Sequence, residues 1–207
     1  MSSEKTALIK KALLINWILI VYNVIEAIVS VTFGIEAQSI ALVGFGLDSM
    51  IEVSSAVILV WRLSHKGTLE EESKKEKQAL FLVGITFFIL AAYIGFEASL
   101  KLWHGDKPEA SLAGVIIATL SVLIMPSLGL AKRKIARQIG SKALEADAME
   151  TIICSYLSGV LLVGLALNWL LGWWWADPVA GLLMIYFLVK EGREAVSGDD
   201  CRGKKCH

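Results

Sequence analysis

The chain has 207 residues, of which 56% are hydrophobic, and its mean hydropathy of +0.63 is well above that of a soluble domain. Its 20 basic and 20 acidic residues give a formal net charge of zero, which offers no support for binding to nucleic acid. Three cysteines, two of them among the last residues, do not make a disulfide framework. No nucleophile–base pattern predicts an enzyme, and we expect no prosthetic group.

Six apolar runs, each long enough to cross a bilayer, follow one another along the chain. They are expected near 12–33, 39–62, 79–102, 111–131, 146–169 and 172–190. The linkers are short except for 62–78, which we interpret as a mixed-charge, solvated loop. The sequence therefore predicts an all-α membrane protein, with a six-helix transmembrane domain over 1–190 and a short cytoplasmic tail over 191–207.

The Lys and Arg residues fall almost entirely on one side of these spans. This holds for 18 of the 20, and the exceptions are Lys101 and Lys107. The positive-inside rule therefore predicts that both termini face the cytoplasm, in a cell (inner) membrane. Five tryptophans then fall at the outer interface, where amphipathic rings anchor helices. They are Trp103, Trp169, Trp173, Trp174 and Trp175.

Two carboxylates interrupt the second apolar run, in the stretch ALVGFGLDSMIEVSSAVILVW (41–61). Asp48 and Glu52 are one helical turn apart and share a face of the predicted helix. A charge at the bilayer centre costs roughly 2.5–3.5 kcal/mol on insertion scales, and acids in this setting mark ion or proton pathways. In the first span Glu26 follows Asn23 by one turn. These two residues are candidate accessory residues of the site. They could serve either as a proton relay or as hydrogen-bond partners of a neighbouring helix.

The second span has a counterpart in the fifth. The segment SKALEADAMETIIC (141–154) aligns with SIALVGFGLDSMIE (39–52) without a gap, so that Asp48 matches Glu150 and Glu52 matches Cys154. The second span is predicted to run inward and the fifth outward, which makes the chain two inverted three-helix halves. Inverted repeats place binding sites near the bilayer midplane, where corresponding helices meet.

Four donors converge if these two helices face each other. Asp48, Glu52, Glu150 and Cys154 would supply three carboxylates and one thiolate, and a tetrahedral divalent cation needs four ligands. An unneutralised acidic cluster is strongly disfavoured in a low-dielectric setting, so a metal ion or protons must balance it. The sequence predicts an exchangeable metal site. The ligand set suits Zn²⁺ best, and Fe²⁺, Co²⁺, Mn²⁺ and Cd²⁺ stay open.

These residues, in this order, resemble the cation diffusion facilitator (cation efflux) family. Its six-helix members carry the pattern S-x-A-L-x-A-D-x-x-[HD]-x-x-x-D in the second and fifth spans. The segments FEASLKLW (96–103) and ADPVAGLLMIYFLVKEG (176–192) are also similar to the family. The resemblance implies a homodimer that exports a divalent metal ion in exchange for protons by alternating access.

The chain departs from the family pattern in three places. Glu150 and Cys154 stand where His and Asp are usual, so the identity of the metal does not carry over. Phe45 replaces an acidic residue whose counterpart, Asp147, is kept; Asp147 is either an entry ligand or a helix-start residue. Most members have a cytosolic metal-binding domain after the sixth span, whereas this chain ends about 17 residues later. Any dimer is therefore expected to rely mainly on membrane contacts.

Two other functions are compatible with buried acids. One is a proton-coupled exporter of drugs or small cations, although four donors suit a bare ion better. The other is a membrane metal-binding partner that modulates another protein without transport. The C-terminal tail also carries soft-metal ligand types, but three donors on a flexible tail are a poor preformed site. They are Cys201, Cys206 and His207.

Overall fold

The computed structural model describes residues 3–197 except 65–68, 106–107 and 110. This part of the chain forms six α-helices and contains no strand. The helices are α1 (Ser3–Glu36), α2 (Ile40–Ser64), α3 (Leu69–His104), α4 (Leu112–Ile139), α5 (Lys142–Leu171) and α6 (Ala176–Ser197). The predicted all-α fold with six helices is confirmed.

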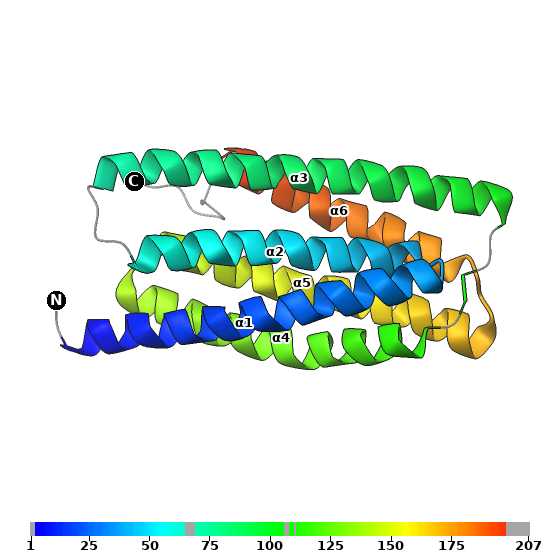
Figure 1. Cartoon of the computed structure of the whole chain (residues 1–207), viewed down its shortest axis with the longest axis horizontal. Helices are drawn as coiled ribbons and strands as arrows, with labels where there is room; N and C mark the ends of the chain where they lie inside the picture. The colour runs from blue at the N-terminus through cyan, green and yellow to red at the C-terminus, as the bar shows by residue number, and fades with distance from the viewer. Residues whose placement is uncertain (1–2, 65–68, 106–107, 110, 198–207) are drawn as a thin grey trace.

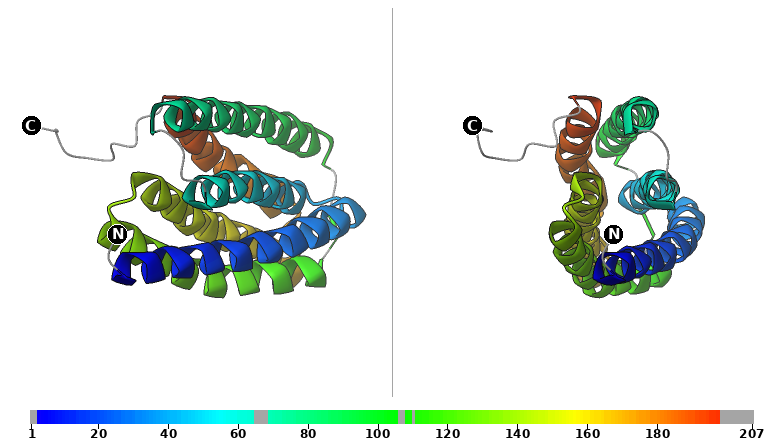
Figure 2. Two further views of the ribbon diagram at one scale, coloured as in Figure 1. Left: turned by 60° about the vertical axis from the view of Figure 1, so that its left-hand side comes forward. Right: turned by 90° about the vertical axis from the view of Figure 1, so that its left-hand side faces the viewer.

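The helices form one elongated bundle in which consecutive helices run in opposite directions (Figure 1). Helix α1 packs against α2, α4 against α5, and α3 against α6; α1 also contacts α4, and α2 contacts α5. In the end-on view, α3 and α6 lie side by side at one edge of the bundle (Figure 2). Corresponding helices of the two halves thus contact one another, as an inverted repeat requires, and α2 also contacts α6. Helix α2 runs antiparallel to α5.

Five of the helices in the described part of the chain are long and apolar enough to cross a membrane, and α6 is the exception. The 22 residues of α6 include Asp177 in the first turn and Lys190, Glu191 and Arg193 near the other end. The apolar part of α6 is consequently shorter than that of its neighbours. Within the bundle its buried face still contributes Met184 and Leu188, which are fully buried.

Two predicted boundaries are wrong. The segment 62–78 was expected to be a loop, but α3 begins at Leu69, well before the apolar run. Glu70 and Glu71 precede Lys74 and Lys75 by four residues, a spacing that favours a helix even in a highly charged segment. The sixth helix begins at Ala176 rather than near 172, because Gly172 ends α5 with a left-handed backbone (φ 64°).

The two copies of the internal repeat start their helices in the same way. Ser39 and Ser141 occupy identical repeat positions, and each hydroxyl accepts a hydrogen bond from the backbone three residues on, Leu42 N at 3.1 Å and Leu144 N at 3.3 Å. These serines are N-caps, which satisfy an amide that the helix leaves unpaired. In the first copy Asp177 of α6 adds bonds to Ser39 Oγ and, at 3.0 Å, to Ile40 N.

The small residues of the repeat permit close helix contacts. A Cβ atom at Gly46 would lie 2.8 Å from Val31 Cγ2 and 2.9 Å from Val31 N of α1. The second copy is approached in the same way from outside the repeat, because a Cβ atom at Gly129 of α4 would lie 2.7 Å from Ile152 Cγ1 of α5. Contacts of this kind are typical of helices packed within a membrane, where small residues let backbones approach.

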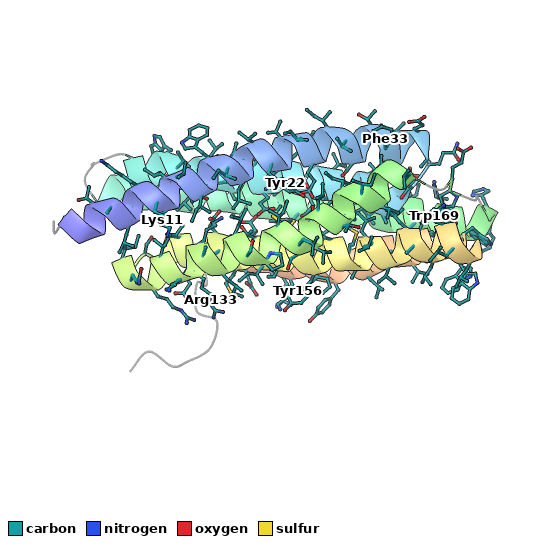
Figure 3. All side chains as sticks on the ribbon, turned by 90° about the horizontal axis from the view of Figure 1, so that it is seen from below. Lys11, Tyr22, Phe33, Arg133, Tyr156 and Trp169 are labelled. Atoms are coloured by element: carbon teal, nitrogen blue, oxygen red, sulfur yellow. The ribbon has the colours of Figure 1, made fainter. Side chains whose placement is uncertain are left out.

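The two ends of the bundle differ in composition. Figure 3 shows Lys11 and Arg133 near one end and Phe33 and Trp169 near the other. We call the first the basic end; α1 begins there, and α2, α4 and α6 end there. The opposite end carries Trp103, which is 87% exposed, together with the tryptophans of the α5–α6 turn. The grouping of basic residues and tryptophans at opposite ends agrees with the predicted spans.

Candidate metal-binding site

The four predicted ligands come together. Asp48 and Glu52 of α2 and Glu150 and Cys154 of α5 all line one small cavity between these helices. Asp48, Glu52 and Cys154 are almost completely buried, with 5%, 4% and 3% of their surfaces exposed. The cavity is therefore an acidic site within the bundle, assembled from matching positions of the two repeat copies.

Apolar layers lie on both sides of the cavity along the bundle. Toward the basic end, Leu59 of α2 and Leu144 of α5 belong to one buried cluster. Toward the other end, Phe45 of α2 and Leu161 of α5 belong to a second cluster, which also includes Cys154. Packed apolar side chains exclude water, so charges in the cavity interact more strongly than they would in solvent.

The donors are held differently. Cys154 Sγ donates to Asp48 Oδ2 across the α2–α5 interface at 3.5 Å, and Glu150 Oε1 accepts from Ser55 Oγ at 3.0 Å. Neither carboxylate oxygen of Glu52 has a hydrogen-bond partner among the described residues. Nor does any group of three or more His, Cys, Asp or Glu side chains in this part of the chain lie close enough together to hold a metal ion. The four donors share a cavity but must converge to coordinate one ion.

Helix α6 adds an acid that the sequence reasoning missed. Glu191 lines the same cavity as the four predicted donors, together with apolar residues of α3, α5 and α6. It lies one residue beyond the predicted sixth span and was assigned to the tail. Helical spacing was the signal that could have found it, because Met184 and Leu188 are buried and Glu191 continues their face.

Asp147 forms an ion pair with a lysine of the neighbouring helix. Lys132 of α4, only 1% exposed, forms an ion pair with Asp147 and donates a hydrogen bond to Thr151 Oγ1 at 3.0 Å. Asp147 does not line the metal cavity but lies one turn before Glu150 on α5. Its ion pair places it in the α4–α5 interface. The burial of Lys132 was not predicted, because the fourth apolar run was expected to end at 131.

Glu26 and Asn23 lie outside the metal cavity. Glu26 is fully buried and contacts Ser49 of α2 and Ser121 of α4, so it joins three helices through hydroxyl groups. Asn23 is also fully buried, and neither of its amide atoms has a hydrogen-bond partner in the described structure. The predicted tail ligands Cys201, Cys206 and His207 lie outside the described residues.

Comparison with known proteins gives one family. The model of the cation efflux transmembrane domain matches residues 16–197. Transmembrane protein 163 of Xenopus laevis is 24% identical over 184 residues, which cover 88% of this chain and 65% of that protein. The uncharacterized transporter MJ0449 of Methanocaldococcus jannaschii is 25% identical over 177 residues, covering 83% and 62%. The cation-efflux pump FieF of Klebsiella pneumoniae is 26% identical over 173 residues, covering 76% and 56%. In each case the chain spans less than two thirds of the relative's length.

Proposed function

Because the family match extends over residues 16–197, the chain belongs to the cation efflux family, and we propose that it carries divalent metal cations across a membrane. The observation that supports this most directly is the shared cavity of Asp48, Glu52, Glu150 and Cys154. The four side chains offer three carboxylates and a thiol inside an apolar bundle. A divalent cation offsets two of the negative charges of such a set, and protons can offset the rest.

We assign the four cavity residues as the ligands of the transported ion. Asp48 and Glu52 supply oxygens from α2, whereas Glu150 and Cys154 supply an oxygen and a sulfur from α5. Ion entry displaces the thiol proton of Cys154 and breaks the bonds that hold Glu150 to Ser55 and Cys154 to Asp48. The mixture of oxygen and sulfur favours Zn²⁺ or Cd²⁺ over Mn²⁺.

The proposed direction is export from the cytoplasm in exchange for protons, by alternating access. When the ion leaves, three carboxylates stay behind in a buried cavity, and their mutual repulsion favours proton uptake. The protein is proposed to work as a homodimer in the inner membrane, with both termini in the cytoplasm. The inverted halves supply two related arrangements of the same helices, which is how repeats of this kind open a central site to either side.

The test is ion flux through the purified full chain in proteoliposomes, loaded in turn with Zn²⁺, Cd²⁺, Fe²⁺, Co²⁺ and Mn²⁺. We expect Zn²⁺ or Cd²⁺ to move fastest and an opposing pH gradient to accelerate the flux. Flux of no ion from the panel would contradict transport and leave a metal-binding role without translocation. Movement of an organic cation alone would favour the small-cation exporter.

A further inference from the structure

A second buried acid forms a hydrogen-bonded cluster of its own. Glu26 Oε2 lies 3.1 Å from Ser49 Oγ of α2, and Glu26 Oε1 is bonded to Ser121 Oγ of α4. The hydroxyl of Tyr22, one turn earlier on α1, lies 2.6 Å from Ser121 Oγ. Figure 3 shows Tyr22 where α1 passes beside α4. We call these four residues the Glu26 cluster.

The charge of Glu26 has no partner in the structure described. No Lys, Arg or His in the described ranges forms an ion pair with it, and the side chain is fully buried. A buried carboxylate without a cation is costly enough that it takes up a proton or binds an ion instead. Asn23, one turn before Glu26 and without a hydrogen-bond partner among these residues, adds an uncommitted amide to the same side of α1.

The number of hydrogen atoms available in the cluster favours the protonated form of the Glu26 carboxyl group. Ser49 Oγ lies 3.0 Å from the backbone oxygen of Phe45 and 3.1 Å from Glu26 Oε2, but a hydroxyl has one hydrogen to donate. The Phe45 oxygen can only accept. With Glu26 ionised, Ser49 must share its hydrogen between the two acceptors. Each contact is a full hydrogen bond when Ser49 donates to Phe45 and Glu26 carries a proton that it donates to Ser49.

The ionised form of Glu26 is accommodated by one small change. Ser49 turns its hydrogen from the Phe45 oxygen to Glu26 Oε2, while Ser121 continues to donate to Oε1 and Tyr22 continues to donate to Ser121. The Phe45 oxygen loses only the hydroxyl bond. Hydroxyl groups serve both forms because they can donate or accept, which a fixed cation such as lysine cannot do.

We propose that Glu26 is a proton-binding site separate from the metal site, and that it exchanges one proton during each transport cycle. In uptake, one proton binds Oε2 and the carboxylate becomes neutral; in release, the same proton leaves and Ser49 again donates to Oε2. The exchange of a proton stands on the cluster alone. Its coupling to the cycle rests on the proposed function. The structural link between the two sites is Ser49, which contacts Glu26 and is the neighbour of the proposed ligand Asp48 on α2.

The coupling is electrostatic. Asp48 and Glu52 interact electrostatically with Glu26, so a divalent cation bound to them would repel a proton at Glu26, and departure of the cation would remove that repulsion. Helix α4, which also packs on α1, contributes the neutral hydroxyl of Ser121. The titratable groups that interact with Glu26 are Tyr22 on α1, Asp48 and Glu52 on α2, and Cys154 on α5.

Infrared spectroscopy of the purified full chain at neutral pH tests the proton directly. Glu26→Gln, a neutral mimic of the protonated acid, should remove the band of one protonated carboxyl group. Glu97→Gln changes a half-buried acid of α3 outside the cluster and should leave that band in place. Ser49→Ala should shift the band, since it removes the acceptor of the Glu26 proton. A spectrum that neither Glu26→Gln nor Ser49→Ala alters would overturn the proposal.

The coupling is tested by counting protons per metal ion in proteoliposomes that contain the wild type or Glu26→Gln. We expect the variant to bind Zn²⁺ and to move about one proton fewer per ion. An equal ratio in the two proteins would overturn the coupling. Absence of Zn²⁺ flux in the wild type would contradict the proposed function instead, and the infrared band would still decide whether Glu26 holds a proton.

Discussion

Glu52 and Glu150 line the same cavity but differ in how their carboxylates are satisfied. Glu52 has no hydrogen-bond partner among the described residues, whereas Glu150 accepts a bond from Ser55. A buried carboxylate without donors gains most from an incoming cation. We therefore expect Glu52 to be available to an ion at once. Glu150 must first leave Ser55.

Removal of the Ser55 hydroxyl should tighten metal binding. Hydrogen bonds to charged groups contribute about 1.5–3 kcal/mol, and 1.4 kcal/mol is a factor of ten in affinity. If the ion draws Glu150 out of this bond, Ser55→Ala should lower the Kd for Zn²⁺ by about tenfold. Calorimetric titration of the detergent-solubilised protein measures the change.

The neighbouring serine provides the control for this experiment. Ser54 is exposed, and its hydroxyl bonds the backbone oxygen of Met50 on its own helix. Ser54→Ala should leave the Kd for Zn²⁺ unchanged. Weaker binding in Ser55→Ala would mean that Ser55 holds Glu150 in the position from which it coordinates the ion.

Cys154 should determine which ions the site prefers. A thiolate is a softer ligand than a carboxylate, so Cys154→Asp should weaken Cd²⁺ and Zn²⁺ relative to Mn²⁺. Cys154→Ser should lower the affinity for Cd²⁺ most, because a neutral hydroxyl is a poor donor. Competition between Cd²⁺ and Mn²⁺ in the wild type and both variants measures this. The same preference in all three would place Cys154 beside the site as a packed side chain.

At the scale of the helices, α4 and α5 are joined by an ion pair that α1 and α2 lack at the matching repeat position. Asp147 of α5 is paired with buried Lys132, whereas its counterpart in α2, Phe45, is a fully buried ring. Removal of one partner from a buried pair leaves an uncompensated charge, which costs far more than replacement of both. The ion pair therefore determines how α4 and α5 pack between the cavity and the basic end.

Lys132→Met should destabilise the bundle by about 3–5 kcal/mol, because it leaves Asp147 buried and unpaired. The double variant Lys132→Met with Asp147→Asn should regain most of that loss. Arg137→Ala is the matched control: its pair with Glu145 joins the same two helices but is exposed, so it should cost about 0–1 kcal/mol. Thermal unfolding in detergent compares the four proteins, and equal losses for Lys132→Met and Arg137→Ala would refute a buried pair.

The sequence pattern could predict the helices and the four residues that share the cavity, but not how far each helix extends. Hydropathy marks the apolar part of a helix, so the charged start of α3 from Leu69 was missed. For the same reason Lys132 and Glu191 were assigned to segments outside the spans. Both occupy the buried face of a helix that continues past its apolar run. Hydrogen-bond partners such as Ser55 depend on tertiary packing, which the repeat alone does not specify.

At the scale of the whole molecule, the basic and tryptophan-rich ends predict the orientation in the membrane. We expect the basic end to face the cytoplasm, because Lys and Arg favour that side. In a background without Cys201 and Cys206, His104→Cys should react with a membrane-impermeant thiol reagent in intact cells. Arg137→Cys, at the basic end, should react only after permeabilisation. Both positions are exposed in the structure, and the reverse labelling pattern would invert the proposed direction of transport.

The central claim is that matching positions of α2 and α5 form one metal site, and Zn²⁺ flux in proteoliposomes tests it most directly. Asp48→Ala and Glu150→Ala each remove one donor from opposite copies of the repeat, so each should abolish flux while the protein remains folded. Glu97→Ala, outside the cavity, should transport like the wild type. Wild-type rates in Asp48→Ala and Glu150→Ala would contradict the account.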